Sequence, residues 1–320
     1  MPRFRSIVAA GLLVALTAPV AAQSDYPNRP VRLIIPFPPG GSNDVVGRMI
    51  GTQLTEQLGK QVVVDNRGGA GGVVGTEIVS KAAPDGYTLL VISLAHAVNP
   101  WLYKLPYDPI KGFVPIGIMG TGPNVLVVHP SLPVRSTQEL IALAKSKPGE
   151  LQYASAGIGT FQHLGSELFK LTAKVDILHV PFKGGGPAMT DVLGGHTKIM
   201  MSSLVQTTPH IKSGKLLALG TGGAKRSAVL PDVPTIAEGL PGYRAENWWG
   251  IVAPAGTPPA IVKRLHAALS AAQDSEAVTK QFSSEGASVV KMSSEEFGKY
   301  MIDEMNKWER VVKEGGIKAE

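Results

Sequence analysis

The segment VRLIIPFPPGGSNDVVGRMIGTQLTEQLG, residues 31–59, decides how this chain folds. Its first five residues, Val31–Ile35, are typical of a buried strand. Apolar residues then recur with the helical period until Gly59, a residue type that commonly ends helices. Between the strand and the helix lies Pro36–Asp44, a turn that contains paired glycines. The segment therefore predicts a strand, a glycine-rich turn and a helix, which together open a βαβ unit.

The same alternation continues to the end of the chain. Strand patterns follow at residues 62–64 and 88–92, with a helical stripe that starts at Val74 between them. A second series begins near Asn124. Its strands are expected at 125–128, 151–154, 177–180, 198–202 and 216–220, and its helices at 136–145, 164–171, 187–193 and 205–213. This rhythm predicts an α/β protein with mainly parallel sheets flanked by helices and joined by right-handed crossovers.

Two such series predict two similar lobes with a cleft between them. We assign residues 25–122 plus 248–320 to lobe 1 and residues 123–247 to lobe 2. A strand at 248–252 returns the chain to lobe 1, and helices follow at 258–272 and from Ser293 onward. This last helix could also pack across to lobe 2. Trp248 and Trp249 are expected in the hinge or the core rather than as a stacking platform for a ligand.

The first 22 residues have the pattern of a secretory signal peptide. Arg3 and Arg5 precede the apolar run Ile7–Leu16, and Val20–Ala22 supplies the small residues of a cleavage site. The apolar run is shorter than the roughly 20 residues that span a bilayer. The alternative, a membrane-anchored helix, is therefore disfavoured.

The composition narrows the class of protein. The chain has 320 residues, 44% of them apolar and 18% charged, which suits packed cores and argues against disorder. The absence of cysteine excludes disulfides, thiolate metal sites and a lipid-anchored cysteine. The formal charge is +6, but the basic residues are scattered, which argues against nucleic-acid binding. Together with the signal peptide, these features predict a soluble exported protein whose natural compartment is a bacterial periplasm.

Two glycine-bearing turns, Pro36–Asp44 and Ser155–Thr160, occupy corresponding places in the two series. Each follows the carboxyl end of a strand and enters a helix N-terminus, where backbone amides and the helix dipole favour an anion. Facing each other across a cleft, the turns would hold a solute by a carboxylate. Neither turn contains Arg or Lys, so neutral donors and water would bind the solute with about micromolar affinity. Asp44 is expected to complement the helix dipole rather than to contact the ligand.

Two further loops, Ser93–Asn99 and Pro181–Pro187, also follow strands and are expected at the same sheet edges. Ser93 and His96 could contact a ligand; local capping with a solvated imidazole is an equal alternative. Lys183 is expected at the rim of the pocket rather than inside it.

Catalytic templates do not match this sequence. No phosphate-binding loop occurs, the dinucleotide fingerprint fails at Val74, and a nucleophile elbow around Ser155 fails at Tyr153. The seven histidines include no i, i+4 pair, so no helical zinc motif exists. We therefore predict no enzymatic activity, no cofactor and no metal. A hydrolase that uses Ser155 in a triad assembled from distant segments is the less favoured alternative.

Several motifs occur together in the order found in a known family. They are PFPPGGSND at 36–44, VDNRGGAGG at 64–72, PDGYTL at 84–89, YASAGIGT at 153–160 followed by His163-Leu164, VPFKG at 180–184 and WGIVAPAGTP at 249–258. With these motifs the chain resembles the Bug-type receptors, the extracytoplasmic solute-binding proteins of tripartite tricarboxylate transporters. The resemblance covers nearly the whole mature chain.

The resemblance implies a two-lobe periplasmic-binding-protein fold, type II-like, that closes on a small carboxylate in the cleft, often through a bridging water. It implies partnership with the membrane permease subunits of the transporter. We also expect a monomer without a nucleic-acid partner. Phe182 replaces the family's usual tyrosine, and Thr160 replaces a common serine, so the identity of the solute stays open. A sensory receptor for a two-component kinase is the alternative among binding proteins.

The expected function is thus capture of a small organic mono- or dicarboxylate and its delivery, unchanged, to a membrane permease. The candidate ligand-binding residues are Phe37, Gly40, Gly41, Ser42, Asn43, Asp44, Ser93, His96, Ser155, Ala156, Gly157, Gly159, Thr160, His163, Lys183 and Gly184.

Overall fold

The structure, a computed structural model, describes residues 26–284, 286–314 and 316–318; the predicted signal peptide, residues 1–22, lies outside this range. The first elements are β1 (Val31–Ile35), α1 (Ser42–Leu58), β2 (Val62–Asn66), the 3-10 turn η1 (Ala70–Gly72), α2 (Val73–Ser80), β3 (Thr88–Ser93), α3 (Leu94–Leu102) and β4 (Phe113–Val128). Next come α4 (Thr137–Ser146), β5 (Gln152–Ser155), α5 (Phe161–Ala173), β6 (Leu178–Pro181), α6 (Gly185–Leu193), β7 (Ile199–Ser203), α7 (Leu204–Lys212), β8 (Leu217–Thr221) and α8 (Ile236–Gly239). The last are β9 (Glu246–Pro254), α9 (Pro259–Asp274), α10 (Glu276–Ser284), β10 (Ser288–Val289) and α11 (Ser294–Glu314).

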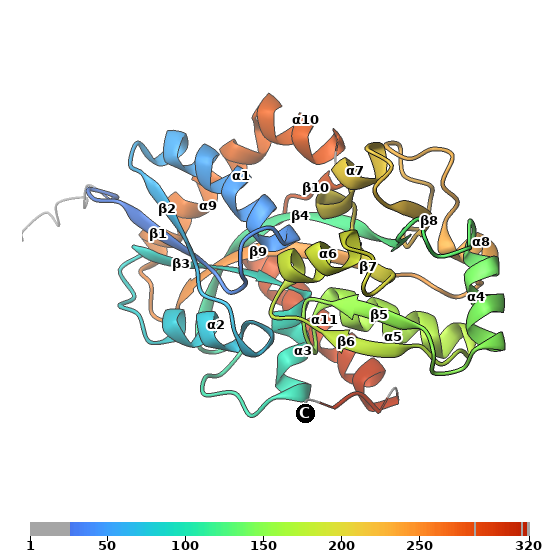
Figure 1. Cartoon of the computed structure of the whole chain (residues 1–320). Coiled ribbons are helices and arrows are strands. Elements are labelled where there is room, and N and C mark those ends of the chain that lie inside the picture. Colours follow the sequence, from blue (N-terminus) through green and yellow to red (C-terminus); the bar gives the residue numbers. More distant parts are fainter. Residues whose placement is uncertain (1–25, 285, 315, 319–320) are drawn as a thin grey trace, which may run out of the picture.

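The strands form two sheets that share the long strand β4. The first sheet has the order β2-β1-β3-β9-β4, and the second has the order β6-β5-β7-β4-β8. Residues 113–123 of β4 pair with β9, whereas residues 124–128 pair with β7 and β8. In Figure 1 the first sheet lies on the left, and the second, in green and yellow, lies on the right. The molecule therefore has two α/β halves, as predicted.

Both sheets follow the same plan. Each is built on three parallel strands with intervening helices, β1 to β3 in the first sheet and β5 to β7 in the second. In each sheet one of the two strands that cross between the halves pairs antiparallel with the third strand of this unit. Strand β9 pairs with β3 in the first sheet, and β4 pairs with β7 in the second. The predicted parallel pairing is thus confirmed within each three-strand unit. The inserted strands run the other way because they enter their sheet from the opposite half.

Apolar burial explains why these segments form strands. All apolar residues of β1 are fully buried, which is typical of a parallel strand covered on both faces. Trp248 and Trp249 of β9 are also buried, in the core as predicted. Successive strand residues point to opposite faces, so Trp248 packs edge-on against Phe297 and Trp249 against Phe282. These contacts fix β9, one of the two strands that cross between the halves.

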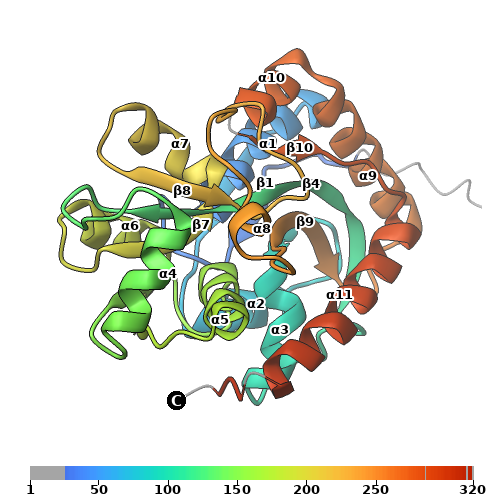
Figure 2. The ribbon, with the colours of Figure 1, turned by 90° about the vertical axis from the view of Figure 1, so that its right-hand side faces the viewer.

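The last helix, α11, runs along the outside of the first sheet together with α9 (Figure 2). Phe297 of α11 covers Gly250 of β9, where a Cβ atom would lie 2.1 Å from the phenyl ring. The carboxylate of Glu304 accepts hydrogen bonds from the indoles of Trp248 (3.2 Å) and Trp308 (3.0 Å). The helix is therefore tied to the strand that returns from the second half.

One predicted loop is wrong. The chain does not turn at Ser93–Asn99, because α3 begins at Leu94 immediately after β3. All residues of this stretch are buried and four of the seven are apolar, and Ser93 takes the extended backbone conformation of a helix N-cap. The direct passage from strand to helix places the first turn of α3 at the carboxyl edge of the sheet.

Candidate ligand-binding site

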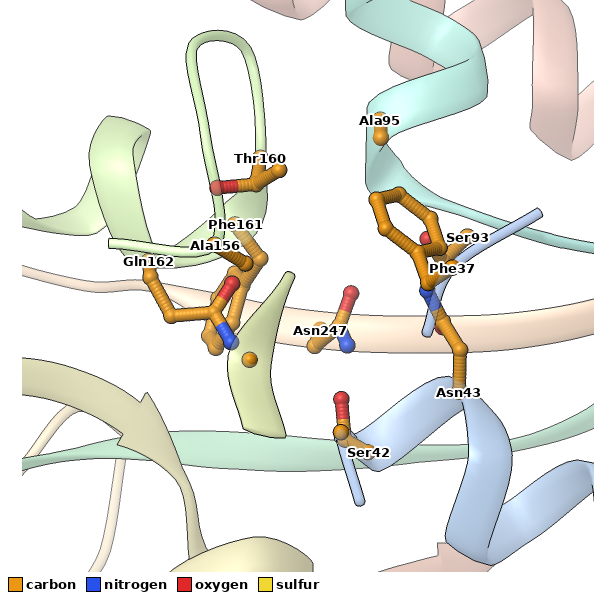
Figure 3. Close-up of a pocket in the computed structure, with 12 residues that line it drawn as sticks. Phe37, Ser42, Asn43, Ser93, Ala95, Ala156, Thr160, Phe161, Gln162 and Asn247 are labelled. Atoms are coloured by element: carbon orange, nitrogen blue, oxygen red, sulfur yellow. The ribbon is translucent and has the colours of Figure 1, made fainter. Parts of the chain in front are cut away.

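A small cavity of about 20 Å³ lies between the two sheets, and we call it the inner cavity. It is lined by Phe37, Gly41, Ser42, Asn43, Ser93, Ala95, Ala156, Thr160, Phe161, Gln162, Gly185 and Asn247. Figure 3 shows Ser42 and Asn43 on one side, Thr160 and Gln162 on the other, and Asn247 between them. The cavity is therefore formed by both halves of the chain and by the strand that connects them.

Four helices begin at this cavity, because each follows the carboxyl end of a parallel strand. They are α1, α3, α5 and α6, and the cavity is lined by their N-cap or first-turn residues. The first N–H groups of a helix have no partner within it, and the helix dipole makes that end positive. None of these four N-termini has a side-chain cap, whereas α4, α7 and α8 are capped by Ser136, Ser203 and Thr235. The uncapped amides face a common space that suits an anion.

Five polar side chains around the inner cavity lack hydrogen bonds to any residue in the described ranges. The amide oxygens of Asn43 and Asn247 are buried without a partner. The hydroxyls of Ser42 and Ser93 and the amide of Gln162 also line the cavity with no bond inside this part of the chain. No acidic or basic side chain is among the described lining residues. The site can thus offer neutral donors and acceptors, but no ion pair, to a bound molecule.

A buried carboxylate holds the turn of the first half from behind. Asp44 accepts hydrogen bonds from the backbone N–H of Gly40 (3.0 Å), from Arg48 Nε (2.9 Å) and from Asn66 Nδ2 (2.9 Å). The same Asn66 nitrogen donates to the carbonyl of Phe37 (2.9 Å). The hydrogen-bond partners of Asp44 among the described residues lie on the protein side of the turn, so this carboxylate supports the turn and does not line the cavity.

Neutral rings hold the turn of the second half. Ser155 Oγ lies 2.6 Å from His179 Nε2 and accepts a hydrogen bond from Gly157 N (3.1 Å). Gly159 N donates to His163 Nδ1 (3.1 Å). The two imidazoles are stacked, with ring centroids 4.2 Å apart. This pair therefore fixes both ends of the turn.

Burial decides the charge of these rings. It lowers the pKa of His163 to about 4 and that of His179 to about 3, so both imidazoles are neutral near pH 7. Tyr153 stacks on the other face of His179 and donates a hydrogen bond to Glu167 (2.6 Å), which also pairs with Lys170. Burial raises the pKa of the Tyr153 hydroxyl, so it remains a donor.

Ser155 and His179 have the spacing of a nucleophile and its general base. Ser155 is completely buried, however, and its oxygen already accepts the Gly157 amide. A substrate cannot reach this oxygen in the observed conformation. The pair therefore supports the turn and does not form an accessible catalytic dyad.

The two halves are closed on each other around the cavity. The hydroxyl of Tyr103 donates across the gap to the carbonyl of Ile158 (3.1 Å). A Cβ atom on Gly186 would lie 2.3 Å from the carbonyl oxygen of Pro39. The backbones of the two halves therefore touch at this point. The contact requires a residue without a side chain at Gly186.

A second space, the outer cavity, adjoins the first and shares Phe37 and Ala156 with it. It has a volume of about 400 Å³ and is lined mainly by the glycine-rich run 68–72 and by Gly157, Ile158 and Lys183. Lys183 is exposed and forms no ion pair or hydrogen bond with the described residues. The outer cavity thus has a free cation at its edge, where the sequence predicted a rim position.

The structure divides the predicted ligand-binding residues into groups. Those that line the inner cavity are Phe37, Gly41, Ser42, Asn43, Ser93, Ala156 and Thr160. Those that line the outer cavity include Gly157 and Lys183. Those that lie beside or behind the turns are Gly40, Asp44, Ser155, Gly159, His163 and Gly184.

His96 requires a correction. It is a buried residue of α3, neither solvated nor part of the cavity wall, and its Nε2 lies 2.8 Å from the carbonyl oxygen of Pro109. Burial lowers its pKa to about 4. The local sequence could not show this orientation, because it depends on the distant residue Pro109.

Sequence reasoning missed five residues of the cavity wall: Ala95, Phe161, Gln162, Gly185 and Asn247. The first four stand at the beginnings of helices that follow predicted strands, so their positions could have been inferred from strand-to-helix junctions. Asn247 is the second residue of β9, the strand by which the chain returns to the first sheet. It pairs with Gly122 of β4. No local pattern marks such a position as part of a site.

Within residues 26–284, 286–314 and 316–318, no three His, Asp or Glu side chains gather in a way that could hold a metal ion. The same described residues contain no helix with the length and apolar character needed to cross a membrane.

The fold and the site define a class: a two-lobe binding protein with its ligand site between the lobes. Residues 46–317 match the family described as tripartite tricarboxylate transporter family receptor. The chain is also 40% identical to Protein BugT of Bordetella pertussis over 98% of each chain. It therefore belongs to the tripartite tricarboxylate transporter receptor family, as the resemblance indicated.

Solved structures agree with this assignment. Periplasmic binding protein BugD is 34% identical, with a TM-score of 0.89 over 92% of this chain and all of its own. A protein of R. palustris solved with adipate is 36% identical, with a TM-score of 0.89 and the same coverage. MatC from Rhodopseudomonas palustris with bound malate is 34% identical, with a TM-score of 0.86 over 90% of this chain and all of its own. One of these similar structures is thus a periplasmic binding protein, and the two others contain a small carboxylate.

Proposed function

We propose that this protein binds a small organic mono- or dicarboxylate in the inner cavity and delivers it, unchanged, to the membrane permease subunits of a tripartite tricarboxylate-type transporter. The observation that carries the proposal is the convergence of four uncapped helix N-termini on one cavity, whose lining residues within the described part of the chain include no acidic side chain. Such an end binds anions because its amides and its dipole both favour negative charge. The adipate and malate in two similar structures support the same class of ligand.

In this proposal the two sheets are the cores of two lobes that open and close. Lobe 1 comprises residues 25–122 plus 248–320, and lobe 2 comprises residues 123–247. Strands β4 and β9 cross between the lobes and serve as the hinge. One carboxylate of the ligand occupies the inner cavity, and the rest of a longer ligand extends past Phe37 into the outer cavity. Closure of the lobes marks the loaded state that the permease recognises.

The location and the assembly belong to the same proposal. Residues 1–22 direct export to the periplasm, the compartment in which the similar BugD acts as a binding protein. In this proposal the chain works as a monomer, and binding needs no cofactor or metal because the ligand is held by amides and neutral side chains.

Isothermal titration of refolded, ligand-free protein against a panel of carboxylates tests the binding step. We expect a dissociation constant near the micromolar range, equivalent to about −8 kcal/mol. Ser42→Ala and Gln162→Leu should weaken binding by about tenfold, since each removes a polar group that faces the cavity. Thr52→Ala changes a residue of the same helix that bonds only to Arg48, and it should leave binding unchanged. Null heats for the whole panel would contradict the proposal.

Uptake measurements test the delivery step. Cells that lack this protein should lose uptake of the bound carboxylate, and loss of the permease subunits should have the same effect. Normal uptake with a lost transcriptional response would instead support a sensory receptor.

A further inference from the structure

A third pocket, which we call the hinge pocket, lies where β4 and β9 cross from one sheet to the other. Its wall includes Pro123 of β4 and Glu246 of β9, which are partners in the register of these two strands. The second half contributes residues 223–228, from the loop after β8, and the first half contributes Ser283 and residues 286–288. The pocket has a volume of about 430 Å³. Both halves of the chain therefore form it.

The two walls of the hinge pocket touch each other beside it. A Cβ atom on Gly286 would lie 2.6 Å from Leu204 Cδ1 and 2.9 Å from Val229 Cγ2, so backbone of the first half lies directly against side chains of the second. Val205, the next residue of α7, is buried in an apolar cluster whose other members come from the first half. A rotation of the lobes about β4 and β9 would change these contacts. The observed shape of the pocket therefore depends on the closed arrangement.

Two other pockets of the molecule lack this property. The pocket beside Leu132 and Lys198 is lined by residues of the second half, and the apolar groove between α9 and α11 is lined by residues of the first. Neither changes shape when two lobes move as rigid bodies. A permease that distinguishes the closed receptor from the open one must contact a surface to which both lobes contribute. The hinge pocket is such a surface.

The charges of the hinge pocket indicate which partner it fits. Among the described residues that line it, three are charged: Lys225, Arg226 and Glu246. Arg226 donates hydrogen bonds to both carboxylate oxygens of Glu238 (2.9 and 2.6 Å), and Glu246 pairs with Arg244 (2.9 Å). Lys225 is exposed and has no hydrogen bond or ion pair with any described residue. The two paired charges are thus neutralised, and the ammonium group of Lys225 is left free.

Neutral donors lie on the same wall. The hydroxyls of Ser227 and Ser288 have no hydrogen-bond partner within the described part of the chain. Most other lining residues are glycine, alanine or proline, which leave room for a side chain that enters from outside. Ammonium and hydroxyl groups both donate to a carboxylate, whereas a cationic partner would be repelled by Lys225. The chemistry of the pocket therefore suits an acidic segment.

We infer that the hinge pocket docks an acidic segment on the periplasmic face of the membrane permease, and that the permease thereby selects the closed receptor. This inference rests on the proposed function and specifies where delivery takes place. The segment binds the closed arrangement, which the carboxylate also stabilises. Binding of the carboxylate and binding of the permease must therefore favour each other by the same factor.

Uptake by spheroplasts that contain the permease but lack this protein tests the inference. Purified mature protein is added at increasing concentration, and the rate of carboxylate uptake is measured. We expect Lys225→Glu to raise the concentration for half-maximal uptake at least tenfold, because it brings a negative charge next to the acidic segment. Its dissociation constant for the carboxylate, measured by titration, should change less than about twofold. Lys145→Glu, at an exposed lysine of α4 outside the pocket, is the matched control and should leave both values within about twofold.

Ala224→Trp tests the space of the pocket without a change of charge. Ala224 is exposed in the loop after β8 and lines the pocket, so an indole there would occupy the room that the segment needs. We expect a similar rise in the concentration for half-maximal uptake. Thermal unfolding checks that this variant and Lys225→Glu remain folded.

The outcomes separate the two proposals. Null heats of titration for every carboxylate would contradict the proposed function itself. Carboxylate binding without any uptake in the presence of the wild-type protein would contradict the delivery step, and the inference with it. Equal half-maximal concentrations for wild type and Lys225→Glu would overturn only the role of the hinge pocket. Equal losses in Lys225→Glu and Lys145→Glu would also overturn it, because the effect would then come from surface charge in general.

Discussion

The two ligand turns have similar roles in the fold but are supported by different chemistry. In the first half, a buried carboxylate, Asp44, collects hydrogen bonds from the turn and from Arg48 and Asn66. In the second half, two stacked neutral imidazoles accept or share the hydrogen bonds of Ser155 and Gly159. The first turn is therefore stabilised by an ionised carboxylate, and the second by buried neutral imidazoles.

The two turns should therefore respond to different perturbations. Removal of one charge loosens the first turn. Addition of a proton loosens the second, since each buried ring must be neutral. The contact between the first turn and the start of α6 in the second half depends on neither, because it is made by backbone atoms of Pro39 and Gly186.

Gly186→Ala tests this meeting point and should have the largest effect. The new Cβ atom would lie 2.3 Å from the carbonyl oxygen of Pro39 and would hold the halves apart. Overpacking of about 3 kcal/mol would weaken ligand binding by about 100-fold. The unfolding temperature of the ligand-free protein should not fall, because alanine suits a helix. Unchanged affinity in a titration would show that this contact is not needed for binding.

Gly51→Ala is the matched control for that variant. It adds a methyl group to another helical glycine, where the nearest atom lies 3.4 Å away, an ordinary contact distance. It should change the affinity by less than about twofold.

Acidification tests the neutral support of the second turn. The unfolded pKa of histidine is about 6.5, whereas burial lowers that of His163 to about 4. The unfolded state therefore binds more protons between these values, so stability is full above about pH 6.5 and decreases as the pH falls toward 4. At pH 5 this histidine alone lowers the free energy of unfolding by about 2 kcal/mol. Urea unfolding at pH 7 and pH 5 measures the change.

His163→Asn should reduce this pH dependence, because the variant has no ring to protonate and keeps an acceptor for the Gly159 amide. His129→Asn, which changes a ring that bonds only to Ser131, should retain it. An equal slope in wild type and His163→Asn would refute the role of the ring.

Asp44→Asn tests the charged support of the first turn. It removes the ion pair with Arg48 and one acceptor oxygen, while the shape is kept. We expect a loss of about 1–2 kcal/mol in the free energy of unfolding at pH 7, with the pH slope from the second turn unchanged. Asp274→Asn breaks an exposed pair with Lys291 and should cost no more than about 0.5 kcal/mol. Equal losses in the two variants would remove the distinction between the turns.

Lys183→Gln should have the smallest effect. The side chain is exposed at the edge of the outer cavity, so its charge attracts an anion without a fixed contact. Affinity should fall less than about threefold, and its dependence on salt concentration should weaken. Lys280→Gln, on the outer helix α10, is the control. A tenfold loss only in Lys183→Gln would mean that Lys183 binds the ligand directly.

Local patterns sufficed to predict most of the fold. Strand β1, helix α1 and their glycine turn were predictable because apolar periodicity and Gly59 act within a few residues. The insertion of β9 between β3 and β4 was not, since it depends on pairing between segments more than 100 residues apart. Helix α3 was missed because it follows its strand without a connecting loop.

The same limit applies to the site. The two turns were found because glycines after a strand and before a helix are a local signal. Asn247 and the stacking of His163 on His179 were not, because they arise from contacts between distant segments. Residues brought together by long-range pairing leave no mark in the neighbouring sequence.

The exchange of strands between the two sheets has a consequence for biosynthesis. The first sheet lacks the strand that joins β3 to β4 until residues 246–254 have been made, because β9 lies between these two strands. A nascent chain that ends before this point leaves two open strand edges, which are sites for aggregation. The first half therefore cannot complete its sheet until most of the polypeptide has been synthesised, and its open strand edges must remain protected until then.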